Sequence, residues 1–273
     1  MKNKLIQALA AIVLPISFIL ILFVLTTTNI IPISKYGLGG TIVTGIALFI
    51  TFIALKIDKK TFKDIGFFLE RKTSIRFTIG FLVGALITTV MLTILICFSS
   101  IELIYNPDSN ITSVLFWLLA FFPLAFMEEI IFRGYAFIKI NKSIGLWPAQ
   151  ILLAILFAWY HDFTGSTLFN QLIGPGIWAL IYGIAAVWSK GLAFPTGLHM
   201  AINVVLALVG QKDSRHAIWN LEYTTEITSA LKGQAETVGV ILQLCVLIIG
   251  IALTEYYRRN QSKINSKTTN SQA

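Results

Sequence analysis

The sequence predicts an all-α protein, a polytopic transmembrane bundle of about eight helices. Of its 273 residues, 56% are hydrophobic and only 12% are charged, and the mean hydropathy is +0.79. Apolar runs of about 20 residues, the length that crosses a hydrocarbon core as a helix, recur along the chain. Basic residues cluster beside these runs. A water-soluble domain is excluded, because the polar residues are too few to cover its surface.

The elements follow in order from these runs. The predicted spans cover residues 5–27, 38–57, 77–99, 112–139, 147–163, 171–189, 191–209 and 237–256. We interpret the first as an uncleaved span, because it is too long for a signal-peptide core and no small-residue cleavage site follows. The fifth to seventh are short, and Pro195 should kink the seventh while Gly174-Pro175-Gly176 loosens the sixth.

The chain reads as one membrane domain with a short polar tail. Residues 1–109 should form the first three helices, 110–210 a core with the polar motifs, 211–257 an extracytoplasmic loop and the last helix, and 258–273 a disordered cytoplasmic tail. The tail prediction rests on its content of Lys, Asn, Ser and Thr. Cys97 and Cys245 lie in apolar runs, so we expect reduced packing residues.

The distribution of cations predicts the orientation. With eight spans, one side carries Lys2, Lys4, Lys59, Lys60, Lys63, Arg71, Lys72, Arg76, Lys139, Lys142, Lys190, Arg258, Arg259 and Lys263. By the positive-inside rule, both termini are cytoplasmic. The richness in Ile, Lys and Asn suggests a bacterial plasma membrane. These anchors account for the net charge of +8, so the expected partners are membrane lipids and a peptide or lipidated-protein substrate, with no nucleic acid.

The fourth span carries two adjacent carboxylates and an arginine, Glu128, Glu129 and Arg133. A charge at this depth costs about 3 kcal/mol or more, so each group needs a partner or a function. Glu129 and Arg133 are four residues apart on one helix face, where an ion pair can form. Glu128 points about 100° away, and a carboxylate without a cationic partner suits a general acid or base. A purely structural cluster is the alternative.

Two later spans carry histidines. His161 ends the fifth, where a lone histidine near a membrane boundary is also typical of an interfacial polar residue. His199 and Asn203 are four residues apart in the seventh, so both lie on one stripe of an apolar helix that should face the bundle interior. They could equally serve as hydrogen-bonding contacts between helices.

Depth along the helices places these side chains at one level. Glu128 and His161 each lie about 20 Å from the basic end of their helix, in the middle part of a core about 30 Å thick. One acid and two histidines suffice to activate water for amide hydrolysis, and Asn203 can donate to the oxyanion. Glu128, His161 and His199 could also ligate zinc. Without an HExxH motif, the spacing does not establish a metal.

Three motifs together resemble one family. They are Glu128-Glu129-x-x-x-Arg133, Phe157-x-x-x-His161 and His199-x-x-x-Asn203, in the family's order and on separate helices. The family is the CPBP intramembrane proteases, which comprises the type II CAAX prenyl endopeptidases and the bacteriocin-processing and immunity (Abi) proteins. The resemblance covers roughly residues 110–210, which we interpret as a CAAX-protease-like catalytic core.

The resemblance implies an intramembrane endopeptidase acting on membrane-associated or lipidated peptides or proteins. The implied catalytic set is Glu128, Glu129, His161, His199 and Asn203, with Arg133 and Phe157 in support. By carry-over, Glu128 and His161 activate the water, while His199 and Asn203 stabilise the oxyanion. Glu129 and Arg133 are then a structural or supporting pair. The family is commonly called metallo-, but a glutamate–water mechanism without zinc is equally compatible with these residues.

Two other functions remain open at the level of sequence. Some members of the family act as non-catalytic membrane scaffolds or bacteriocin-immunity partners. Buried Glu and His also serve proton- or metal-coupled transporters. Such a transporter predicts an inverted repeat, which the sequence does not display.

Overall fold

The computed structural model describes residues 2–28, 36–161, 167–223 and 228–270. Its helices are α1 (Lys2–Thr27), α2 (Tyr36–Ile57), α3 (Arg71–Cys97), α4 (Ile111–Glu129), α5 (Ala136–Ile144), α6 (Leu146–Tyr160), α7 (Leu168–Gln171), α8 (Ile177–Ser189), α9 (Ala193–Leu208) and α10 (Ser229–Asn270). Two short 3-10 turns are η1 (Phe62–Ile65) and η5 (Ser214–His216), and two π-helical turns are η2 (Ile130–Tyr135) and η4 (Leu172–Gly176). The two strands are β1 (Ile101–Tyr105) and β2 (Trp219–Tyr223).

The protein is an all-α membrane bundle, as the sequence predicts. Within the described residues, six helical segments are long and apolar enough to cross a membrane: Asn3–Thr27, Gly39–Ile57, Arg71–Cys97, Ile111–Ile144, Leu168–Ser189 and Ala230–Ile264. Two shorter apolar helices, Leu146–Tyr160 and Ala193–Leu208, lie among them. These segments correspond to the eight predicted spans, with boundaries that shift by a few residues.

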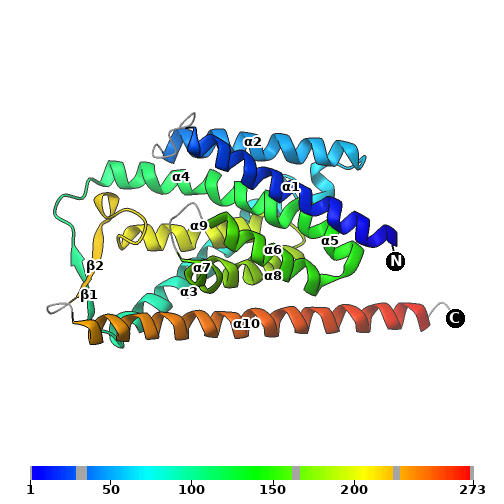
Figure 1. Cartoon of the computed structure of the whole chain (residues 1–273). Helices are drawn as coiled ribbons and strands as arrows, with labels where there is room; N and C mark the ends of the chain where they lie inside the picture. Colours follow the sequence, from blue (N-terminus) through cyan, green and yellow to red (C-terminus); the bar gives the residue numbers. More distant parts are fainter. Residues whose placement is uncertain (1, 29–35, 162–166, 224–227, 271–273) are drawn as a thin grey trace.

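The helices run along a common direction, so the molecule has two distinct ends (Figure 1). The start of α1 and the end of α10 lie at one end. We call it the basic end, because Lys63, Lys142 and Lys190 line one cavity there together with Tyr257 of α10. The strands β1 and β2 lie at the other, the strand end. Between them, α1 packs on α5, α2 on α4, α8 on α10, and α3 most extensively on α9.

Glycines allow α3 and α9 to touch through their backbones. A Cβ at Gly80 of α3 would lie 2.2 Å from the carbonyl oxygen of Phe194, and a Cβ at Gly197 of α9 would lie 2.1 Å from that of Phe77. Small residues at such crossings give membrane helices close packing, because no water is available to drive side-chain burial. The contact fixes the position of α9, which carries His199.

A π-helical turn divides the fourth span. Turn η2 joins α4 to α5, and Gly134 within it has a non-helical ψ of −114°. The predicted single helix therefore bends at Gly134, five residues after Glu129, and α5 changes direction at the basic end. The predicted loosening near Pro175 coincides with the second π turn, η4. The kink predicted at Pro195 lacks a cause, because this proline occupies the first turn of α9, where its missing N–H breaks no helical hydrogen bond.

A small sheet at the strand end was not predicted. Strand β1 pairs antiparallel with β2, from Ile101 opposite Tyr223 to Tyr105 opposite Trp219. Each strand has only five residues and no long alternation of polar and apolar side chains. Both strands lie in segments between membrane spans, so a prediction based on long apolar runs did not detect them.

The last helix is longer than the sequence suggests. Helix α10 continues to Asn270, whereas residues from 258 onward were expected to form a disordered tail. Arg258 and Arg259 pair with Glu255 at 2.6 and 2.7 Å, three and four residues earlier. Such pairs stabilise a solvated helix, so the polar chain extends the apolar span without a break.

Gly80→Ala should lower the melting temperature (Tm) of the detergent-purified protein. The added Cβ forces α3 away from the Phe194 carbonyl, and such overpacking typically costs about 1–3 kcal/mol. Gly45→Ala is the matched control, because a Cβ at Gly45 of α2 meets nothing within 4 Å. Thermal unfolding followed by intrinsic fluorescence compares the two. Equal Tm values for both variants would contradict the close α3–α9 contact.

Candidate active site

His199 of α9 lies between the two carboxylates of α4. Its Nδ1–H donates to Glu129 Oε1 at 2.9 Å, and its Nε2 lies 3.5 Å from Glu128 Oε2. Glu128 and Glu129 point about 100° apart around their helix, but the two ring nitrogens lie on different edges of the imidazole and reach both. The sequence predicted that Glu128 and Glu129 point in different directions. In the structure both carboxylates nevertheless contact the same residue, His199.

The ion pair predicted from the spacing of four residues is formed. Arg133 Nη1 lies 3.6 Å from Glu129 Oε1, the same oxygen that accepts from His199. The Arg133 and Glu129 side chains are 2% and 0% exposed. Glu129 is therefore not neutralised by Arg133 alone, because His199 makes the shorter contact.

Aromatic rings enclose this charged cluster. The Arg133 guanidinium carbon lies 4.2 Å from the centre of the Phe157 ring and 5.0 Å from that of Tyr182. Both contacts are within cation–π distance. Tyr182 also stacks on His199, with centroids 4.5 Å apart and an interplanar angle of 14°. The rings restrict the rotation of both polar groups and exclude water around them.

Phe157 connects the second histidine to the cluster. Its ring lies 4.7 Å from that of His161 and 6.0 Å from that of His199. His161 follows α6, and its Nδ1 lies 2.8 Å from the Phe157 carbonyl oxygen. A carbonyl can only accept, so Nδ1 carries the proton and Nε2 of the neutral ring is an acceptor. His161 is also within electrostatic reach of Glu128 and His199.

Asn203 lies one turn beyond His199 on α9 and is half-buried. In the part of the chain that the structure describes, no hydrogen bond joins it to Glu128, Glu129 or His199. Helices α4 and α9, the turn η2 and the residue after α6 thus supply the five polar residues that lie together, Glu128, Glu129, Arg133, His161 and His199. Asn203 lies beside them on α9.

Two tyrosines belong to the site although the sequence reasoning passed over them. The Tyr160 ring lies 5.0 Å from His161, and its phenol interacts with the Glu128 carboxylate. Tyr182 covers His199, as described above. In the sequence, the feature that could have pointed to them was a tyrosine within an otherwise apolar span, in α6 for Tyr160 and in α8 for Tyr182. That signal is weak, because tyrosine is also common at membrane boundaries.

A short loop after α9 approaches the site from the strand end. Lys212 interacts electrostatically with Glu128 and His161. Burial lowers the pKa of Lys212, and attraction to Glu128 only partly offsets this. Lys212 falls within the predicted extracytoplasmic loop, outside the three motifs, so it was not among the predicted site residues.

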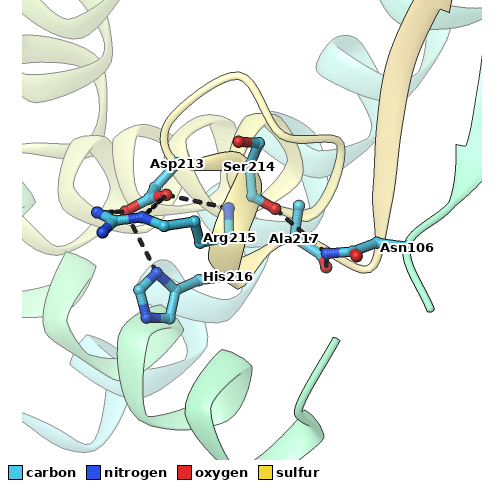
Figure 2. Close-up of polar contacts among 6 residues, drawn as sticks. All are labelled: Asn106, Asp213, Ser214, Arg215, His216 and Ala217. Carbon is cyan, nitrogen blue, oxygen red and sulfur yellow. Dashed lines mark hydrogen bonds and ion pairs between the residues drawn. The ribbon is translucent and has the colours of Figure 1, made fainter. Parts of the chain in front are cut away.

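Polar contacts hold this loop in place (Figure 2). The Asn106 side chain, next to β1, donates to the carbonyls of Ser214 and Ala217 at 3.2 and 3.0 Å. Asp213 pairs with Arg215 at 2.8 Å and with His216 at 3.3 Å. The hydrogen bonds from Arg215 lower the pKa of Asp213 to about 2, so the pair persists at any ordinary pH.

The arrangement can transfer a proton at one particular atom. Glu128 Oε2 is buried and has no hydrogen-bond partner within the described residues. A buried carboxylate oxygen without a donor is a strong acceptor, and the side chain remains 12% exposed. Glu128 Oε2 lies near His161, whose Nε2 is also an acceptor. The Glu128 carboxylate can therefore bind a water molecule and remove its proton.

Among the described residues, the possible donors are not grouped around one metal position. In the described ranges, no group of three or more His, Cys, Asp and Glu side chains is arranged to hold a metal ion. His199 already gives Nδ1–H to Glu129 and turns Nε2 toward Glu128. We therefore derive no step that passes through zinc.

Comparison with known families agrees with the three motifs. Residues 110–205 match the family model described as type II CAAX prenyl endopeptidase Rce1-like. The matched segment lies within residues 110–210, where the resemblance was predicted, and contains every predicted site residue. No curated protein matches the chain.

Arg133→Met should destabilise the protein strongly. The buried Glu129 loses its guanidinium partner and keeps only the contact with His199 among the described residues, and breaking a buried ion pair in this way typically costs about 3–5 kcal/mol. The double variant Arg133→Met/Glu129→Gln should recover much of this loss, because the buried carboxylate charge is also removed. Unfolding in denaturant measures all three proteins. A double variant no more stable than the single one would rule out the ion pair as the cause.

Proposed function

We propose that this membrane protein, whose residues 110–205 belong to the type II CAAX prenyl endopeptidase Rce1-like family, cleaves peptide bonds with a water activated by Glu128. The family is one of intramembrane proteases, and its substrates here are proposed to be membrane-associated or lipidated peptides. The observation that carries the proposal is the buried Oε2 of Glu128, which accepts no hydrogen bond among the described residues and lies 3.5 Å from His199 Nε2.

Water activation uses Glu128 and His161. The water donates one hydrogen bond to Glu128 Oε2 and the other to the unprotonated Nε2 of His161. As the water oxygen attacks the scissile carbonyl carbon, its proton passes to Glu128. General-base catalysis of this kind contributes about 10²–10⁴-fold. The protonated Glu128 then gives that proton to the leaving amine, so the carboxylate is regenerated.

We assign His199 the role of a donor to the oxyanion. Glu129 holds one edge of its ring through Nδ1, and the other edge, with Nε2–H, would face the reacting centre beside Glu128. An oxyanion on the substrate would accept from this Nε2–H and from the Asn203 amide, which is oriented by the same helix. A fixed donor of this type is worth about 10²–10³-fold in rate.

The proposed orientation follows from the lysines. We place the basic end in the cytoplasm, with both termini, by the positive-inside rule. Glu128 interacts electrostatically with Lys212, whose loop approaches from the strand end. The bond to be cut would therefore lie in the half of the membrane nearer the strand end, under the loop that carries Lys212.

Glu128→Gln should abolish turnover while the fold is retained. The amide cannot take a proton from water, so the rate should fall roughly 10³-fold. Glu102→Gln, on the exposed strand β1, is the matched control and should keep the wild-type rate. Two substrates are used: a farnesylated CAAX peptide, and membranes of cells lacking the protein, whose released peptides are identified by mass spectrometry.

If Glu128→Gln releases the same peptides as wild type at the same rate, the base assignment is wrong. If wild type, Glu102→Gln and Glu128→Gln all release none, while a cellular phenotype survives Glu128→Gln and His199→Ala at normal expression, the protein acts as a non-catalytic membrane partner.

Chelation should leave cleavage unchanged. The proposed mechanism uses carboxylate and imidazole groups alone, so treatment with EDTA and metal-free buffer should not alter the wild-type rate. A known zinc peptidase treated in parallel must lose its activity. Stoichiometric zinc in wild type that is absent from a His161→Ala/His199→Ala variant, with activity restored by added zinc, would replace this mechanism with a metal-dependent one.

A further inference from the structure

A cavity of about 470 Å³ opens at the basic end, and Glu128 does not line it. Its polar wall comes from separate elements and includes Lys63, Asp64, Asn141, Lys142, Lys190 and Tyr257. Arg133 forms part of the wall, and both of its terminal guanidinium nitrogens are buried without a hydrogen-bond partner in the described chain. Positive groups from η1, α5 and the end of α8 thus converge on one space.

The charge of this cavity is not cancelled within the protein. Lys63, Lys142 and Lys190 form no ion pair among the described residues, so three positive charges face one acid, Asp64. That acid is engaged elsewhere, because its Oδ2 accepts from the backbone N–H and the hydroxyl of Thr61, each at 2.8 Å. These hydrogen bonds lower the pKa of Asp64. Even with Asp64 ionised, the lysines leave a net charge of two positives for an anion.

A second cavity, of about 390 Å³, adjoins the first and is apolar. It lies between α3, α4 and α9, and its wall includes Phe67, Phe77, Phe122 and Phe126. Ordinary lysine anchors at a membrane surface would require no such neighbour. The combination of a cationic space and an aromatic groove side by side is what an amphipathic anion needs.

The two cavities share a wall made of Gly66, Phe68, Gly191 and Leu192. Gly66 and Gly191 touch through their backbones, since a Cβ at Gly66 would lie 2.7 Å from the Gly191 Cα. The Leu192 N–H donates to the Gly66 carbonyl at 3.2 Å. The backbone contact of Gly66 with Gly191 and Leu192 holds the two cavities next to each other. It lies where the apolar spans end and the lysines begin.

One buried polar atom belongs to the apolar cavity. Thr196 is 2% exposed, lines the groove, and its Oγ1 has no partner within the described ranges. A hydroxyl left unpaired among aromatic rings is costly unless a ligand oxygen reaches it. An ester carbonyl near the head of an acyl chain would supply that oxygen.

We propose that these two cavities together bind an anionic phospholipid, with its phosphate among Lys63, Lys142 and Lys190 and an acyl chain in the aromatic groove. The negative lipid surface attracts such basic groups. The site is separate from the peptidase chemistry and does not rest on it. Arg133 lines the phosphate cavity and also contacts Glu129, so the lipid would lie against the opposite side of the residue that holds the catalytic cluster.

The test measures lipid binding to the detergent-purified full chain by native mass spectrometry. The probes are phosphatidylglycerol and phosphatidylcholine of equal acyl chains, with glycerol 3-phosphate and inorganic phosphate as competitors that lack a chain. The variant is Lys63→Gln/Lys142→Gln/Lys190→Gln. The matched control, Lys4→Gln/Lys59→Gln/Lys72→Gln, removes three exposed lysines that line neither cavity.

Wild type and the control variant should bind phosphatidylglycerol equally. The cavity variant should bind it roughly 100-fold more weakly, on the scale set by three basic residues at an anionic surface. Phosphatidylcholine should bind more weakly than phosphatidylglycerol, and neither chain-free competitor should displace the lipid at equal concentration. If the Tm of the lipid-free cavity variant is lower than that of wild type, the three single Lys→Gln variants replace it. Each single variant should weaken phosphatidylglycerol binding several-fold.

Three outcomes overturn the proposal. Wild-type affinity in the cavity variant would show that these lysines do not hold the phosphate. Equal binding of the two lipids would show that charge is not recognised. Displacement by glycerol 3-phosphate or inorganic phosphate at equal concentration would show a site for free phosphate rather than for a lipid. None of these readouts depends on peptide cleavage, so they leave the proposed function untouched.

Discussion

The burial of two adjacent carboxylates in one apolar helix is the constraint on which the rest of the site depends. Glu129 is completely buried, so its charge must be balanced by nearby partners. Arg133 is one such partner, from the next turn of the same chain, and His199 is another, from α9. The second of these contacts determines the bundle, because it brings α9 against α4 and requires glycines where α9 meets α3. Phe157 and Tyr182 then cover the charges and bring α6 and α8 alongside.

The sequence predicted much of this because its main features are local. Apolar length predicts the spans, and a separation of four residues predicts the Glu129–Arg133 pair. Three spaced motifs predicted the resemblance, and the segment that carries them, residues 110–205, matches the model of the Rce1-like family. The contact of His199 with both glutamates was not predictable, because it depends on how α9 is rotated relative to α4. That rotation comes from packing between helices far apart in the chain.

Other features could not be predicted from the pattern of apolar residues, because they depend on contacts with specific partners. The pairing of β1 with β2 joins loops more than 110 residues apart. The extension of α10 to Asn270 depends on arginines that pair with Glu255, whereas composition alone suggested disorder. Tyr160 and Tyr182 look like ordinary aromatic residues of a span until their neighbours are known. In each case the deciding partner is a side chain or strand that no local window contains.

The backbone contact between α3 and α9 has a consequence for access to the site. At Gly80, Gly84 and Gly197, even a methyl group would collide with a carbonyl oxygen of the facing helix. A seam of this kind has no side chains that could swing aside, so these two helices should move as one rigid wall. A bulky molecule that approaches Glu128 through the bilayer must therefore enter elsewhere, between helices whose contact is made by flexible side chains and whose separation can widen transiently.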